Sequence, residues 1–423
     1  MPFRKLVSGT FVAAIDQAWL SGLNFVIGLA FIHGTTRIEY GRYAMLFNGI
    51  LLAQSIQNAL ITSPMTTVIP MREGAIRSQL MSDVRKAQAV LSVLLPLLGA
   101  VFVWAAFAIR SRAGEPAWPA LPFGVAVLGV LLREFLRSVC FLEGVPARAL
   151  ATDVAYGVLL LSAVAYLLAA GQWDASAALL AMGVAAVAAT ACGLRRRGSA
   201  TEVNTVRAAG RGMRELWPYA RWALPSVLVT WGYMNAYVYV VGAQMGAAAV
   251  GDLSAGRLLL VPLSMMFVAW TSMFRPRASR WVALGELPTL NGYVRHSLVA
   301  VLGVVCGYGL VLFTLYPIIQ PLLLGEKYAR LEPVVTAWLA FFTVNGIRTV
   351  GMACMLTADR GYRAMYYYGW VAFLTSVPLV LLAGVLASPV GVVLALCMAE
   401  AVLAALIWFR GWPRMHSFRG AAP

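Results

Sequence analysis

The sequence predicts an all-α membrane protein of about twelve transmembrane helices, arranged as two pseudo-symmetric lobes of six helices with both termini on the cytoplasmic side. Three observations predict this fold class: the composition, the spacing of the apolar segments and the distribution of Lys and Arg. Of the 423 residues, 61% are hydrophobic and 12% are charged, whereas a soluble domain carries roughly 45–50% apolar and about 25% charged residues. Most of this chain therefore cannot face water.

The apolar segments are long enough to span a hydrocarbon core about 30 Å thick, which takes about 20 residues of helix. Each segment must be helical, because unpaired backbone polar groups are too costly in lipid. Alternating segments of about ten residues, as in an outer-membrane barrel, are not found in the sequence. The predicted spans are 8–33, 41–70, 87–109, 118–141, 147–170, 175–194, 217–242, 250–274, 297–317, 333–356, 366–386 and 390–409.

The basic residues alternate from one predicted loop to the next, and this sets the orientation. With the N-terminus placed inside, 25 of the 33 Lys and Arg residues fall on the inner side and six on the outer side, while Arg257 and Arg348 lie within spans. Cytoplasmic loops carry such an excess of Lys and Arg, so we assign the formal charge of +16 to topology and expect no nucleic-acid partner. Only three basic residues are lysines, which suggests a GC-rich bacterial genome. We expect the protein in the bacterial cytoplasmic (inner) membrane.

A polar, arginine-rich stretch divides the chain into two halves. We predict an N-terminal six-helix lobe at 1–194, a basic cytoplasmic linker at 195–216 and a C-terminal six-helix lobe at 217–423. A weak internal repeat supports this division, because Asn24 and Gly41 in the first half correspond to Asn235 and Gly251 in the second. Internal duplication is common in secondary transporters, with the substrate bound between the halves.

Motifs of enzymatic chemistry are missing from the sequence. There is no P-loop, and the five cysteines and three histidines have neither metal-ligand nor disulfide spacing. The predicted outer loops are too short for a catalytic domain. We therefore expect no catalytic residue, no cofactor and no metal, and a membrane glycosyltransferase or polymerase is the less favoured alternative.

Charged side chains within the predicted spans are the first candidates for a binding site, because each is costly there unless it is paired or hydrated. Arginine suits a pyrophosphate, since its planar guanidinium donates paired hydrogen bonds and stays charged. The same arginines can instead pair with acids and join helices. Asp16 and Glu400 are candidates for ion coupling or for such structural pairs. The candidate arginines are Arg133, Arg137, Arg257 and Arg348.

Amide side chains within the spans form a second set of candidates. They can hydrogen-bond the hydroxyl groups of a sugar, and they can equally bond one helix to another. These residues are Asn24, Asn48, Gln54, Gln57, Asn58, Asn235 and Asn345.

Short motifs recur at corresponding places in the two halves. In the first half they are Asp16-Gln17, Asn24 and Gly41-Arg42-Tyr43-Ala44, and in the second Gly251-Asp252-Leu253-Ser254-Ala255 and Phe274-Arg275-Pro276. Together with the predicted spans and the central basic linker, the pattern resembles the multidrug/oligosaccharidyl-lipid/polysaccharide (MOP) flippase superfamily, and within it the polysaccharide flippase branch of Wzx-like proteins.

The resemblance implies alternating access between two lobes and a polyprenyl-pyrophosphate-linked oligosaccharide as substrate, flipped from the inner to the outer leaflet for O-antigen or exopolysaccharide assembly. It implies polysaccharide polymerase and export proteins as partners beside the lipid bilayer, and we expect a monomer. The main alternative is a MATE-like, ion-coupled antiporter of cationic compounds, in which Asp16 would match a coupling Asp of the first helix. The arginines within the spans favour the flippase.

Overall fold

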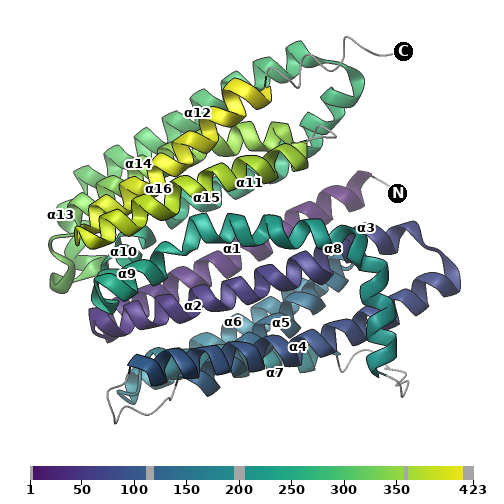
Figure 1. Cartoon of the computed structure of the whole chain (residues 1–423), viewed down its shortest axis with the longest axis horizontal. Coiled ribbons are helices and arrows are strands. Elements are labelled where there is room, and N and C mark those ends of the chain that lie inside the picture. The colour runs from purple at the N-terminus through teal and green to yellow at the C-terminus, as the bar shows by residue number, and fades with distance from the viewer. Residues whose placement is uncertain (1–2, 111–118, 195–204, 357–360, 413–423) are drawn as a thin grey trace. The chain divides into compact units, whose positions relative to one another are not determined.

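The computed structural model describes residues 3–110, 119–194, 205–356 and 361–412, and these residues are almost entirely helical, with no β-strand among them (Figure 1). Within these ranges nine helices are long and apolar enough to cross a membrane, or ten if one bent pair counts as a single span. This confirms the prediction of an all-helical, multi-pass membrane protein.

The chain folds into two compact units. Unit 1 comprises Met1–Thr35 and Arg42–Leu228, and unit 2 comprises Thr36–Gly41 and Val229–Pro423. The first turn of α2 therefore belongs to unit 2. Helices α1 to α8 are Phe3–Gly34, Arg37–Gln57, Ser63–Val68, Gly74–Arg110, Ala120–Leu142, Pro146–Ala169, Ala175–Leu194 and Thr205–Asn235, with a π-helical turn, η1, at Asn58–Thr62 and a 3-10 turn, η2, at Ile69–Met71.

Unit 2 continues with eight further helices and three short turns of other helix types. Helices α9 to α16 are Tyr237–Gln244, Ala247–Leu258, Val261–Leu284, Leu287–Thr314, Tyr316–Ile319, Glu332–Met355, Gly361–Val385 and Pro389–Ala405. The π-helical turns are η3 at Gln320–Leu324 and η5 at Leu406–Gly411, and η4 at Glu326–Tyr328 is a 3-10 turn. The end of α8, from Val229 on, also belongs to this unit.

Nine of the twelve predicted spans coincide with helices that are apolar enough to cross a membrane, and a tenth coincides with the bent pair. The predicted span at 250–274 is broken, because α10 and α11 meet at an angle of 55°. Pro262 lies in the first turn of α11, and a proline has no backbone N–H to continue the preceding helix. The spans predicted at 118–141 and 217–242 correspond to α5 and to α8–α9, which are helical but are not among these candidates; α5 carries three charged residues close together, Arg133, Glu134 and Arg137.

The basic linker predicted at 195–216 is only partly a connecting segment. Residues 195–204 lie outside the described residues, and from Thr205 the chain is already helical. The helix that begins there, α8, contains Pro218 and Pro225, and its residues up to Leu228 belong to unit 1.

Two corresponding glycines allow two helices of unit 2 to cross at backbone contact. A Cβ atom on Gly41, in α2, would collide with the carbonyl oxygen of Ala247, and one on Gly251, in α10, would collide with that of Arg37. Small residues permit such close crossings in membrane helices. The Arg37 guanidinium is 3.2 Å from the carboxylate of Asp252 beside this contact. The crossing therefore needs glycine at both positions.

Candidate functional site

A buried group of ionisable side chains lies in unit 1, where α1, α5 and α6 meet. Nε of Arg137 is 2.8 Å from Oδ2 of Asp16 and 3.3 Å from Oδ2 of Asp153. Nη1 of Arg137 is 3.4 Å from Oε1 of Glu134, and Nη1 of Arg133 is 3.1 Å from Oδ1 of Asp153. We call these five residues the acidic cluster, since three carboxylates face two guanidinium groups.

Neighbouring aromatic residues hold the acidic cluster in place. The guanidinium carbon of Arg133 is 4.1 Å from the ring centroid of Tyr156, a cation–π distance. The indole N–H of Trp19 donates to the backbone carbonyl of Asp153 at 2.9 Å. Gly157 lies against the Trp19 ring, where a Cβ atom would collide with it. A small residue one turn from Asp153 thus lets α1 and α6 approach each other.

The acidic cluster carries unbalanced charge. With every group ionised it has one negative charge more than positive charge, and an uncompensated charge is costly within a membrane. Oδ1 of Asp16 accepts no hydrogen bond within the described part of the chain. The cluster therefore has a charge that a cation can balance.

Unit 2 contains a second buried ion pair, between α14 and α16. Nε of Arg348 contacts Oε2 of Glu400, and the two side chains are 8% and 1% exposed. Nδ2 of Asn345 donates to Oε1 of Glu400 at 3.4 Å, and Nη1 of Arg348 donates to Sδ of Met352 at 3.2 Å. The partners of both charged groups come from unit 2 itself, so this pair joins two helices.

Arg257 differs from the other three candidate arginines. Among the described residues it has no carboxylate within ion-pair distance, and its side chain is only partly buried. Its guanidinium carbon is 5.5 Å from the ring centroid of Trp338, and the Tyr40 hydroxyl lies near enough for electrostatic interaction. The Trp338 indole N–H donates to the backbone of Leu253 at 3.0 Å, which orients the ring. Arg257 is thus a positioned cation that can accept an anion.

Four of the seven candidate amides already use their N–H groups inside a unit. Asn48 donates to the Ala44 carbonyl at 2.8 Å and Asn235 to the Trp231 carbonyl at 3.4 Å, each one turn earlier in its helix. Gln57 donates to the Leu131 carbonyl at 2.7 Å, which joins the end of α2 to α5, and Asn345 donates to Glu400 as described above. These four amides therefore hydrogen-bond within a helix or between two helices of the same unit.

The other three amides lie at the surface of unit 1. Asn24 and Asn58 are exposed and Gln54 is partly exposed. Asn58 uses its carbonyl oxygen, which accepts from the Thr62 hydroxyl at 2.8 Å. It also begins the π-helical turn of α2, and such turns are frequent at functional sites. These amides are the ones with donors directed away from the unit's own core.

The structure brings together residues that the sequence suggested only one at a time. Asp16 pairs with Arg137 and Glu400 pairs with Arg348. Asp153 was missed by the sequence analysis. Its signal was an acidic residue within the predicted span 147–170, the same signal that identified Asp16.

Comparison with known proteins identifies the fold. The chain matches the lipid II flippase MurJ in an inward closed conformation, with a TM-score of 0.72, 12% sequence identity and coverage of 95% of this chain and 87% of MurJ. It matches an inward-facing multidrug resistance MATE family transporter of the MOP superfamily with a TM-score of 0.66, 15% identity and coverage of 98% and 96%. It also matches a MOP superfamily transporter from Pyrococcus furiosus, described as having a binding pocket of reversed polarity. That match has a TM-score of 0.64 and 14% sequence identity, and it covers 98% of this chain and 96% of the other.

These similarities show that the chain shares the fold of these MOP superfamily structures. No family model matches the sequence, and no curated protein matches it.

Proposed function

We propose that this protein is an alternating-access transporter that flips a polyprenyl-pyrophosphate-linked oligosaccharide across the cytoplasmic membrane, and that Arg257 receives the diphosphate. The observation that carries this proposal is the charge at Arg257, which no carboxylate among the described residues neutralises. A cation at membrane depth is costly without a counter-ion. A diphosphate supplies that counter-ion and matches the guanidinium's paired donors.

Asn24, Gln54 and Asn58, which the sequence also suggested for the sugar, are exposed or partly exposed and stay candidates for hydrogen bonds to hydroxyl groups. Amide groups offer both donors and acceptors to hydroxyl groups. Arg133, Arg137 and Arg348, which the sequence also suggested for the diphosphate, are instead proposed to hold helices together through their ion pairs. The polymerase and export partners, the monomeric state and the bacterial location expected from the sequence belong to this same proposal.

The acidic cluster is proposed to couple transport to an ion gradient. It holds one carboxylate in excess over its guanidinium groups, so it can take up a proton without the help of another group. Asp16 and Asp153 are the proposed coupling carboxylates, and Glu400 is assigned to the structural pair with Arg348.

A second candidate function, a MATE-like antiporter of cationic compounds, is favoured by the same acidic cluster. Its excess negative charge suits a cationic substrate as well as a proton. The two functions predict different substrates. The flippase carries an anion that pairs with Arg257, whereas the antiporter carries a cation and gives Arg257 no role.

Transport in proteoliposomes tests the proposal directly. A fluorescent polyprenyl-pyrophosphate oligosaccharide reports flipping, and a cationic dye reports drug efflux from vesicles of the same preparation. Losing a hydrogen bond to a charged group costs about 1.5–3 kcal/mol, so Arg257→Gln should reduce flipping by about ten- to a hundredfold. Arg257→Lys should retain part of the activity, since it keeps the charge and loses the paired donors.

Arg330→Gln is the matched control, because Arg330 is an exposed arginine of unit 2 and its loss should leave flipping unchanged. Dye efflux without flipping would reject the flippase and support the antiporter. Flipping that survives in Arg257→Gln would remove Arg257 from the site while leaving the flippase itself in place.

A further inference from the structure

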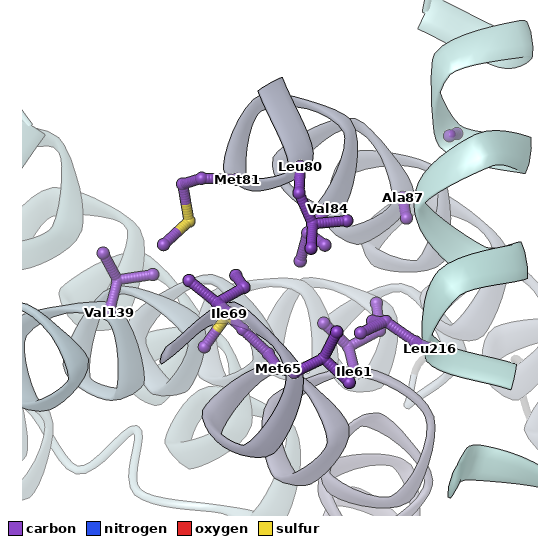
Figure 2. Packing of buried hydrophobic residues seen from close by; sticks show 11 residues of the cluster. Ile61, Met65, Ile69, Leu80, Met81, Val84, Ala87, Val139 and Leu216 are labelled. Carbon is purple, nitrogen blue, oxygen red and sulfur yellow. The ribbon is translucent and has the colours of Figure 1, made fainter. Parts of the chain in front are cut away.

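The start of α8 is packed firmly against unit 1. Figure 2 shows the buried apolar cluster to which it contributes Leu216, together with Val84 of α4 and Ile61, Met65 and Ile69 of the segment that follows α2. All five of these side chains are at most 6% exposed. Gly212 lies so close to α4 that a Cβ atom there would collide with the Asp83 backbone. One face of α8 is therefore fixed in position.

Ion pairs tie the same segment to its neighbours. Nε of Arg211 is 3.2 Å from Oδ2 of Asp83 in α4, and Nη2 of Arg72 is 3.2 Å from Oε2 of Glu215. These contacts add to the apolar packing and restrict rotation of α8 about its axis. The opposite face of the helix must then point away from unit 1.

That opposite face carries three unpaired arginines. Arg207, Arg214 and Arg221 recur every seven residues, close to two helical turns, so they form one stripe. All three are exposed, and in the described part of the chain none lies within ion-pair distance of a carboxylate. We call them the arginine stripe. In contrast to Arg211, none of them is neutralised by a carboxylate of the described residues.

Exposed aromatic residues flank the arginine stripe. Trp217, Tyr219 and Trp222 are 48%, 45% and 68% exposed, and the Arg221 guanidinium lies 5.8 Å from the Trp222 ring centroid. Trp and Tyr are enriched where a membrane meets water, because their rings are apolar and their N–H or O–H groups are polar. Arginines next to such aromatic residues are typical of a helix that lies in the membrane–water interface.

The direction of α8 agrees with that position. Figure 1 shows its start crossing α4 near the beginning of that helix, at the right of the view. Helix α4 is a membrane-span candidate of 33 residues, Gly74–Ala106. At 1.5 Å per residue it is much longer than a hydrocarbon core of about 30 Å, so one end projects. A helix that crosses this polar end runs along the membrane surface.

We propose that residues 205–222 of α8 form a binding surface for anionic phospholipid head groups, with the arginine stripe contacting their phosphates and Trp217 and Trp222 anchoring the helix at the interface. The sign of the charge decides between partners, since three unpaired cations beside aromatic anchors fit an anionic leaflet and not a zwitterionic one. A basic residue near an anionic surface contributes about 1 kcal/mol, which corresponds to about fivefold in affinity.

Lipid titration of the purified full-length protein in non-ionic detergent tests this proposal. Thermal unfolding is followed while short-chain phosphatidylglycerol, phosphatidylcholine of equal chain length, or inorganic phosphate is added. The wild type should be stabilised by phosphatidylglycerol alone. The variant R207Q/R214Q/R221Q should bind it about a hundredfold more weakly, and R214Q about fivefold. The control R280Q/R295Q/R330Q removes three exposed arginines of unit 2 and should bind as the wild type does.

An equal loss in the control variant would overturn the proposal in favour of a general charge effect. Stabilisation by inorganic phosphate would replace the lipid with a soluble anion. A second measurement uses reconstituted protein and a lipid brominated close to the head group, which quenches tryptophans at the interface. Trp222→Phe should remove part of the quenching, and an unchanged quenched fraction would place Trp222 outside the interface.

Discussion

Removing one partner of the Arg348–Glu400 pair should destabilise the protein far more than removing both. The two side chains are 8% and 1% exposed and contact each other directly, so neither charge has water to replace its partner. Leaving one charge of a buried pair uncompensated costs about 3–5 kcal/mol, whereas replacing both with uncharged residues is often nearly neutral. The losses in free energy of unfolding of the two single variants should therefore sum to about 6–10 kcal/mol. The double variant should have a free energy of unfolding close to that of the wild type.

The two single variants should also differ from each other. In Arg348→Met the remaining carboxyl of Glu400 can take up a proton and become neutral. In Glu400→Gln the guanidinium keeps its charge, because arginine is not deprotonated in proteins. Glu400→Gln should thus be the more damaging change, even though it keeps a carbonyl oxygen for the hydrogen bond from Asn345.

The assay is unfolding in mixed micelles, with the free energy of unfolding measured for the wild type, both single variants and R348M/E400Q. The exposed pair Arg72–Glu215 is the matched control. Its atoms are 3.2 Å apart and its side chains are 46% and 50% exposed, so its coupling energy should stay below about 1 kcal/mol. A double variant at 348 and 400 as unstable as the sum of the single variants would refute the reasoning.

The same variants separate structure from transport. If Arg348 serves only to join α14 and α16, R348M/E400Q should fold and flip the lipid-linked sugar as the wild type does. If Arg348 binds the diphosphate, the double variant should fold and fail to transport.

Two further predictions concern the helix crossing and the acidic cluster. Gly41→Ala should lower the unfolding temperature, because the added Cβ atom meets the Ala247 backbone. The control Gly307→Ala, in open space within α12, should raise the free energy of unfolding by up to about 1 kcal/mol. Equal effects of the two substitutions in a thermal unfolding assay would contradict the close crossing. Asp153→Asn should abolish transport driven by a proton gradient. Its folded yield should exceed that of Arg137→Gln, because two guanidinium groups then face two carboxylates, whereas Arg137→Gln leaves three carboxylates facing one guanidinium group. Proton-driven transport that persists in Asp153→Asn would remove Asp153 from the coupling group.

Hydropathy located the spans well where a helix begins and ends at the membrane surface. The predicted spans 147–170 and 175–194 differ by at most one residue at either end from α6 and α7. By contrast α4 begins at Gly74 and not at 87, and α12 begins at Leu287 and not at 297. Hydropathy detects where the apolar residues begin, while a helix can extend beyond the lipid as long as its side chains remain polar.

The pairing of charges could not be predicted in the same way. Arg137 and Asp16 are 121 positions apart in the chain and come from α5 and α1. Helical spacing shows that Arg133 and Arg137 share one face of α5, but it contains no information on which helix covers that face. The same limit applied to Asp153, whose importance depends on α6 lying beside α1 and α5.

The charges that remain after pairing favour one function over the other. In unit 2 Arg348 is neutralised by Glu400, and Arg257 is left as a cation over Trp338. In unit 1 the acidic cluster is left with one negative charge. A transporter of cationic compounds accounts for the acidic cluster and leaves the desolvation of Arg257 without compensation. An anionic lipid-linked substrate compensates Arg257 and leaves the cluster free to bind a coupling proton, so it accounts for both residual charges.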